Sequence, residues 1–278
     1  MATVEQATPG GSGNLIDALY DAVSGFGDLA IFSGKAIAWA FRQRSSTRIL
    51  VPVFHAVGVK SVPVVAVTGL FIGMVIAIQS YDQFSQLGMA THLGGIINLS
   101  VVRELGPVLA ACMLAGRIGS AMAAELATMR ITEQIDALEC LGANPIAYLV
   151  VPRLLACVLL IPLLTILADF MGVMGGALIC TKLFHVDAYH YWHHAEGIIG
   201  YWDMSTGLIK PMFFGAAIAI ISCHRGFNSC AGAEGVGRAA TEAFVSSFIA
   251  IFILDFFLAM FLNTMYGFLW PGAGPKLL

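Results

Sequence analysis

Five long apolar segments alternate with shorter polar stretches along this chain. They cover approximately residues 62–81, 96–126, 149–183, 205–223 and 244–266. About 20 apolar residues in a helix cross the hydrocarbon core of a bilayer, and each segment approaches or exceeds that length. Backbone groups inside that core must satisfy their own hydrogen bonds, which an α-helix allows. The pattern therefore predicts an all-α integral membrane protein with about five transmembrane helices.

The first 44 residues differ from the segments that follow. Residues 1–13 are polar, and we expect them to be disordered. Residues 14–44 alternate apolar and polar positions at helical spacing and lead into closely spaced arginines. A soluble amphipathic helix is the alternative, but the chain offers no soluble core for such a helix to cover. We therefore expect this helix to lie on the cytoplasmic surface of the membrane.

Composition supports lipid as the main solvent of the chain. Charged residues make up 11% of the 278 positions, hydrophobic residues make up 58%, and the mean hydropathy is +0.84. Soluble domains carry about 25% charged residues. The net charge is −3 without a basic tract, which argues against nucleic acid as a partner. The six cysteines form no CxxC motif, so we expect them to pack in the membrane and to bind neither a metal nor a cofactor.

Lysine and arginine residues are unevenly distributed between the two ends of the predicted spans. With the N-terminus in the cytoplasm, most arginines fall on cytoplasmic segments, whereas Lys182, Lys210 and Lys276 fall on the opposite side. Positive residues favour the cytoplasmic side of a membrane. An odd number of spans then places the C-terminus outside. No internal repeat divides residues 14–278, so we treat them as a single domain.

Ionisable residues inside the apolar segments are the first candidates for function. The second segment contains Arg103, Glu104 and Arg117, and a charge inside a span costs about 2.5–3.5 kcal/mol on insertion scales. Arg103 and Arg117 are about four helical turns apart and can share one polar face. Alternatively, Arg103 and Glu104 mark the outer boundary of the membrane. Deeper in other spans, Asp169 and Asp255 can bind a lipid headgroup, relay protons or pair with an arginine.

A polar helical segment at residues 130–142 separates the second and third spans. Its apolar positions recur at helical spacing and are Ile131, Ile135, Leu138 and Leu141. Its polar positions are Arg130, Glu133, Gln134, Asp136 and Glu139. Gly142 is expected to end the helix. A short helix of this kind on the cytoplasmic side suits docking into a groove of a soluble partner, whereas a solvated loop helix is the alternative.

A glycine-rich stretch at residues 226–244 precedes the last span. Its GAEGVG sequence superficially resembles a phosphate-binding turn, but no strand precedes it and no GK[ST] follows it. Both are needed for a nucleotide site of that kind. We expect a flexible cytoplasmic turn that leads Arg238 and Glu242 into the membrane.

Three histidines cluster in the sequence HYWHH on the opposite side. His190 and His194 can share a helical face and hold zinc, with His193 beside them. No HExxH motif is present, so we expect these residues to anchor the chain at the membrane interface. No Ser–His–Asp or Cys–His set stands out either, and we expect no catalytic site.

A resemblance to a known family comes from two stretches. Residues 103–156 read RELGPVLAACMLAGRIGSAMAAELATMRITEQIDALECLGANPIAYLVVPRLLA, and the later sequences GVGRAATEAFV and LDFFL precede and enter the last span. Together they resemble the MlaE (YrbE) family of permease subunits of MCE-associated ABC transporters, which move lipids across the cell envelope. The likeness covers nearly the whole chain after residue 14.

The resemblance implies an architecture and a set of partners. The architecture is an amphipathic N-terminal elbow helix with five spans, in an inner-membrane homodimer with a central lipid cavity. The partners are a cytoplasmic ABC ATPase subunit, an MCE-domain protein on the outer side and a second permease copy. The family's cavity charges fall on Arg103, Glu104 and Arg238, and its coupling helix on residues 130–142. Glu242 stands where some relatives carry a second arginine.

We therefore expect the permease subunit of a phospholipid transporter, with ATP hydrolysis in a separate subunit. An ion-coupled secondary transporter that uses Asp255 or Asp169 is the second hypothesis, and an intramembrane lipid-modifying enzyme is the third. Activity that requires ATP and a co-purified ATPase separates the first hypothesis from the second. A chemically altered lipid product would indicate the third. On the first hypothesis, the residues expected to contact lipid are Arg103, Glu104, Arg117, Arg238 and Asp255.

Overall fold

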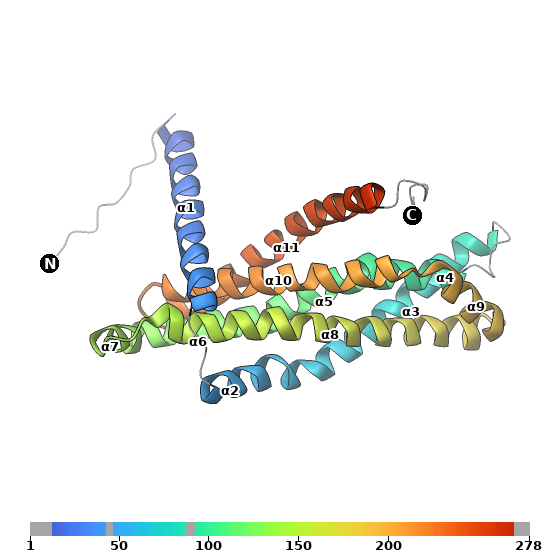
Figure 1. Cartoon of the computed structure of the whole chain (residues 1–278), viewed down its shortest axis with the longest axis horizontal. Helices are drawn as coiled ribbons and strands as arrows, with labels where there is room; N and C mark the ends of the chain where they lie inside the picture. Colours follow the sequence, from blue (N-terminus) through green and yellow to red (C-terminus); the bar gives the residue numbers. More distant parts are fainter. Residues whose placement is uncertain (1–12, 43–46, 87–92, 270–278) are drawn as a thin grey trace.

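The computed structural model describes residues 13–42, 47–86 and 93–269, and these residues form helices and turns without any strand (Figure 1). The α-helices are α1 (Gly13–Arg42), α2 (Thr47–Val57), α3 (Val62–Gln86), α4 (Leu93–Ser100), α5 (Gly106–Leu114), α6 (Ser120–Ile131), α7 (Gln134–Cys140), α8 (Val151–Leu178), α9 (Ala188–Ile198), α10 (Tyr201–Phe227) and α11 (Ala233–Leu269). One 3-10 turn, η1 (Val59–Ser61), joins α2 to α3. The π-helical turns are η3 (Val101–Leu105), η4 (Ala115–Gly119), η5 (Ile146–Val150) and η6 (Ile179–Leu183).

Five helical segments in the described residues are long and apolar enough to cross a membrane, so the predicted number of spans is confirmed. They are Thr47–Gln86, Gly94–Ile131, Ile146–Leu183, Tyr201–Phe227 and Ala233–Leu269. All are longer than the apolar stretches in the sequence, and the first span is extended most, because it includes α2 from Thr47 onward. A helix of 38 residues is about 57 Å long. A bilayer with its headgroups is about 40–45 Å thick, so the longer spans project beyond it.

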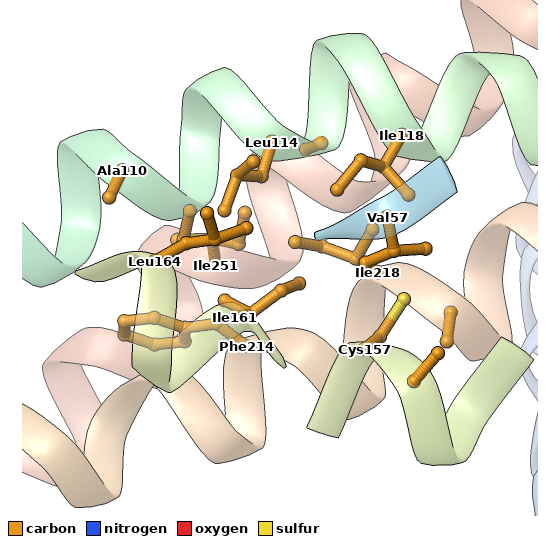
Figure 2. Close-up of a cluster of buried hydrophobic side chains, with 14 of the residues drawn as sticks. Val57, Ala110, Leu114, Ile118, Cys157, Ile161, Leu164, Phe214, Ile218 and Ile251 are labelled. Atoms are coloured by element: carbon orange, nitrogen blue, oxygen red, sulfur yellow. The ribbon is translucent and has the colours of Figure 1, made fainter. Parts of the chain in front are cut away.

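The spans form a lengthwise bundle in which α8 packs between α3 and α10 (Figure 1). The other long helices join it, with α4 to α6 running beside α10 and α11 leaving the bundle at an angle. α1 lies crosswise at the end where α7 sits, and α9 covers the opposite end. The largest core cluster draws on α2, α5, α8, α10 and α11 and includes Leu114, Ile161, Phe214 and Ile251 (Figure 2). Inside lipid this core is held by close van der Waals packing, since lipid tails are as apolar as leucine.

Glycines in the first and third spans let α3 and α8 approach closely. A Cβ atom on Gly73 would overlap the backbone carbonyl of Gly172, and one on Gly69 would lie 2.5 Å from the carbonyl oxygen of Ala168. Only glycine fits at such a backbone contact. This contact fixes how the first and third spans cross.

Most of residues 185–203 belong to α9 and the start of α10. Tyr191 of α9 is fully buried against α4, and its hydroxyl donates to Asn98 Oδ1 over 3.1 Å. Burial raises the pKa of the Tyr191 phenol, which therefore stays protonated and keeps donating. Packing against α4 gives this segment a partner that its own sequence does not reveal.

One other expectation needs correction. The glycine-rich stretch is helical from Ala233 onward, so the flexible turn is confined to residues 228–232. Glycine weakens a helix by only about 1 kcal/mol, and α10 and α6 pack against this part of α11. The disorder expected for residues 1–13 lies outside the described residues, except for Gly13, which begins α1.

Candidate functional site

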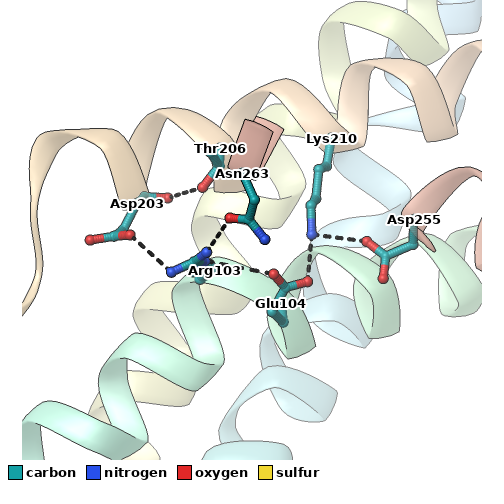
Figure 3. A network of polar contacts seen from close by, with 7 residues as sticks. All are labelled: Arg103, Glu104, Asp203, Thr206, Lys210, Asp255 and Asn263. Atoms are coloured by element: carbon teal, nitrogen blue, oxygen red, sulfur yellow. Dashed lines mark hydrogen bonds and ion pairs between the residues drawn. The ribbon is translucent and has the colours of Figure 1, made fainter. Parts of the chain in front are cut away.

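A cluster of charged side chains lies inside the bundle where the second, fourth and fifth spans meet (Figure 3). The second span contributes Arg103 and Glu104, α10 contributes Asp203 and Lys210, and α11 contributes Asp255 and Asn263. We call these six residues the charge cluster. Arg103 and Glu104 belong to the π-helical turn η3, whose wider backbone ring is a common feature of functional sites.

Lys210 is the buried centre of one half of the cluster. Its side chain is 1% exposed, and its ammonium lies between two carboxylates. It donates to Glu104 Oε2, and its Nζ lies 3.0 Å from Asp255 Oδ1. A buried ammonium group is stable as a charge only when it is paired in this way.

Arg103 forms the other half. Its Nη2 donates to Asn263 Oδ1 over 2.6 Å, and its Nη1 lies 3.6 Å from the buried Asp203 Oδ1. Its Nε lies 3.7 Å from Glu104 Oε1, so Glu104 bridges Arg103 and Lys210. Asp203 Oδ2 accepts from the backbone N–H of Gly200, which fixes this carboxylate at the start of α10.

The cluster has three carboxylates and two cations and is therefore formally negative by one charge. Glu104 is its most accessible charged member, with a side chain that is 41% exposed, whereas that of Lys210 is almost fully buried. An apolar groove of about 450 Å³ lies between α3, α5 and α11. It begins one to two turns after Glu104 along the second span. Leu109, Phe71 and Phe248 line it. Polar groups beside an apolar groove suit an amphipathic ligand.

Sequence analysis finds Arg103, Glu104 and Asp255 but assigns Lys210 to the outer side. The structure places Lys210 inside the fourth span, so it cannot serve as a marker of loop orientation. Its position within the predicted span 205–223 is the signal that identifies it, because a lysine there is as costly as Arg103. Asp255 thus has the buried partner that the sequence allows for, with lysine in place of arginine.

Arg117 and Arg238 lie outside the charge cluster. Arg117 donates to Ser61 Oγ beside η1, so it does not share a face with Arg103. The π-helical turns η3 and η4 each hold an extra residue and rotate the helix that follows. Arg238 has a side chain that is 72% exposed and pairs with Glu242 at 2.7 Å. Along the axis of α11, Arg238 lies about 25 Å from Asp255.

The predicted docking segment is divided between two helices. Arg130 lies in the last turn of α6 and pairs with Asp136 of α7. Glu133 lies in the turn between the two helices with a positive φ of 57°. Gln134 begins α7 and donates to Thr132 Oγ1 over 3.0 Å. Gly142 ends α7 as predicted, with a φ of 76°. Its N–H donates to the backbone carbonyl oxygen of Glu139.

The apolar stripe of this segment is partly occupied, contrary to expectation. Ile135 is buried and Leu138 half-buried against the bundle, in a cluster that includes Ala36 of α1 and Cys223 of α10. Only Leu141 is strongly exposed, at 82%. A groove of about 720 Å³ separates α7 from α1, and Lys35, Arg130 and Glu139 contribute charges to it. The free surface of α7 is therefore mainly polar, with Leu141 at its end.

Among the side chains that the structure describes, no group of three or more His, Cys, Asp or Glu residues converges on a possible metal site. The side chains of His190 and His194, on which the zinc alternative depends, lie outside the described part of the structure. Asp169 faces Gly106 across the α5–α8 contact, where its Oδ1 is buried without a hydrogen bond from any described residue.

Comparison with known proteins places this geometry in a family. Residues 50–261 match the family described as Permease MlaE. A probable ABC transporter permease protein of Rickettsia felis is 42% identical over 225 residues, covering 80% of this chain and 85% of the relative. The intermembrane phospholipid transport system permease protein MlaE of Haemophilus influenzae is 36% identical over 198 residues, covering 71% and 76%. The chloroplastic protein TRIGALACTOSYLDIACYLGLYCEROL 1 of Arabidopsis thaliana is 36% identical over 217 residues, covering 78% and 62%. The chain is a multi-pass membrane protein of the MlaE permease family.

Proposed function

We propose that this chain is the permease subunit of an ABC transporter that moves phospholipids between membranes. The charge cluster inside the bundle is the observation that carries the proposal. Charged groups inside a membrane span cost free energy, and those that are present usually have a function. The names of the Rickettsia and Haemophilus relatives support an ABC transporter and a phospholipid substrate. An ABC permease depends on a separate ATPase subunit, so the chain itself performs no chemical step.

The charge cluster is suited to exchanging its internal partners for a lipid phosphate. Arg103 has planar guanidinium donors that bind a phosphate at two points. In the structure those donors are occupied by Asn263, Asp203 and Glu104. We propose that these residues hold Arg103 in place until a phosphate replaces them, while the apolar groove near Leu109 accepts an acyl chain.

We propose partners and an orientation for the two ends of the bundle. The ATPase docks at the α7 end, in the cytoplasm, and an MCE-domain protein docks at the α9 end. The exposed apolar surface of α11 supports a second permease copy, because only 17% of its most apolar stretch is buried within the chain. Arg238, at the proposed cytoplasmic end of α11, is a proposed headgroup contact at a different depth from the charge cluster. We propose the inner membrane as the location of the protein.

Replacing Arg103 with alanine tests the proposal. We expect the purified complex with its ATPase to lose about tenfold or more of its lipid transfer between vesicles, the loss typical of a charge-assisted hydrogen bond. Arg103→Lys keeps the charge but not the planar donors and should fall between alanine and wild type. Lys182→Ala, at the opposite end from α7, is the matched control for loss of a positive charge and should transfer lipid normally.

Two results would contradict the proposal. Normal transfer by Arg103→Ala would remove the charge cluster from the lipid path. Loss of expression with normal transfer per surviving complex would make Arg103 a structural residue.

A further inference from the structure

A polar pocket separate from the charge cluster lies between α2, α6 and the start of α8. Its volume is about 510 Å³. Its charged lining residues are Lys60, Arg117, Glu125 and Arg153, and its apolar wall includes Val57 and Met122. We call it the α2–α6 pocket.

The α2–α6 pocket carries an excess of positive charge. Arg153 is only 6% exposed, and its Nη2 lies 3.0 Å from Glu125 Oε2. That pair neutralises the one carboxylate of the lining. Lys60 forms no ion pair within the described residues, and Arg117 makes only a hydrogen bond to Ser61 Oγ. Three cations against one carboxylate leave a formal charge of +2, whereas the charge cluster is negative.

Irregular backbone places both unpaired cations at this pocket. Lys60 belongs to η1, which interrupts the first span between α2 and α3. Arg117 belongs to the π-helical turn η4 in the second span. The buried Ser61 hydroxyl donates to the carbonyl of Val57, so it accepts from Arg117 and orients the guanidinium. The remaining donors of Arg117 and the ammonium of Lys60 are available to a ligand.

The α2–α6 pocket lies in the half of the bundle nearer α7. Arg153 lies about 10 Å from the α7 end of the third span, and Arg117 about 21 Å from the α7 end of the second, counted at 1.5 Å per residue. Each of these spans is about 57 Å long, so both arginines lie on the α7 side of its midpoint.

We propose that the α2–α6 pocket binds the phosphate group of a membrane phospholipid at Lys60 and Arg117. Two cations within a partly apolar pocket suit a phosphate diester with its acyl chains along Val57 and Met122. The site binds lipid on the α7 side of the membrane whether or not the charge cluster transports it. Part of the pocket belongs to the first span, which follows α1 in the chain.

Native mass spectrometry of the full chain in detergent tests this site with two lipids that share their acyl chains. Dioleoyl phosphatidylglycerol carries a phosphate and dioleoylglycerol does not. We expect wild type to retain the first lipid and lose the second. Lys60→Gln and Arg117→Gln should each reduce retention of phosphatidylglycerol about tenfold. Lys182→Gln, a matched charge removal at the far end, should retain it like wild type, and Arg117→Lys should retain most of it.

The same measurement in an Arg103→Ala background separates this site from the charge cluster. The loss caused by Lys60→Gln must persist there, whatever Arg103→Ala does to transport. Because Lys60 is exposed, Lys60→Gln carries the test even if Arg117→Gln does not fold. Unchanged retention in Lys60→Gln would overturn the proposal. Thermal stabilisation by inorganic phosphate equal to that by phosphatidylglycerol would overturn the assignment to a lipid.

Discussion

At the scale of single residues, charge inside this protein is stabilised by partners that come from different spans. Lys210 on α10 holds Glu104 of the second span and Asp255 of α11, and Arg153 on α8 holds Glu125 of α6. A buried ion pair does not by itself stabilise a fold much, because removing both charges from water costs several kcal/mol. Removing one partner is different, since the remaining charge is then buried alone.

We expect Lys210→Met to lower the free energy of unfolding by about 3 kcal/mol, toward the lower end of the range for a broken buried pair. The lower end applies because Glu104 is partly exposed and can be rehydrated, whereas Asp255 is more deeply placed. Thermal unfolding of the purified chain in detergent measures the change. Lys210→Arg, which keeps the charge, should recover part of the loss, and Lys182→Met should unfold like wild type. A Lys210→Met chain as stable as wild type would show that the ammonium contributes nothing to the fold.

At the scale of elements, the interruptions in the helices are where the polar sites form. The π-helical turns η3 and η4 present Arg103 and Arg117, and the 3-10 turn η1 presents Lys60 and Ser61. A straight α-helix through residues 103–117 would place both arginines on similar faces. The two π-helical turns instead direct one toward α10 and α11 and the other toward α2. The second span thus contributes side chains to both the charge cluster and the α2–α6 pocket.

The short helix α7 is the element with the clearest mechanical prediction. Leu141→Asp should abolish co-purification of the ATPase, because it places a charge on the exposed apolar end of the proposed docking surface. Its melting temperature should stay within about 2 °C of wild type, since surface substitutions change stability by about 0.5 kcal/mol or less.

Leu138→Asp and Tyr189→Asp are the controls. Leu138 is half-buried in the bundle, so its replacement should lower the melting temperature as well as co-purification. Tyr189 is exposed on α9 at the opposite end, and Tyr189→Asp should leave the ATPase bound. Undiminished co-purification with Leu141→Asp would remove α7 from the interface.

At the scale of the whole molecule, the bundle has two ends of different character and an unpartnered flank. α1 and α7 form one end, and α9 forms the other (Figure 1). α11 exposes a row of large apolar side chains that includes Phe252, Phe256 and Phe257. In a membrane, lipid or a second copy of the chain can cover them without a cost in free energy.

Native cysteines test the proposed orientation. Cys140 on α7 and Cys230 between α10 and α11 are exposed at the same end of the bundle, which we propose is cytoplasmic. A membrane-impermeant thiol reagent should label them only after the cells are lysed. Tyr189→Cys on α9, in a chain with Cys140→Ser and Cys230→Ser, should react in intact cells. The opposite labelling pattern would invert the orientation and place the C-terminus in the cytoplasm.

The sequence by itself determined the number of spans and the end of α7 at Gly142. These features depend on local hydropathy, spacing and backbone freedom, which the chain carries wherever it folds. The family likeness of residues 103–156 also lies in the sequence alone. None of these inferences needs knowledge of which helix neighbours which.

Only the tertiary structure decided which charges meet. Lys210 and Glu104 are 106 residues apart in the chain, so their pairing depends on how α10 packs against the second span. Arg117 and Arg103 face different neighbours because of two π-helical turns, which the spacing of residues in the sequence does not predict. The apolar stripe of α7 found its partner in Ala36 and Cys223, on elements distant in sequence. Each outcome is set by contacts between helices. Periodicity within one helix shows which of its faces is apolar or polar, but it does not specify which helix packs against that face.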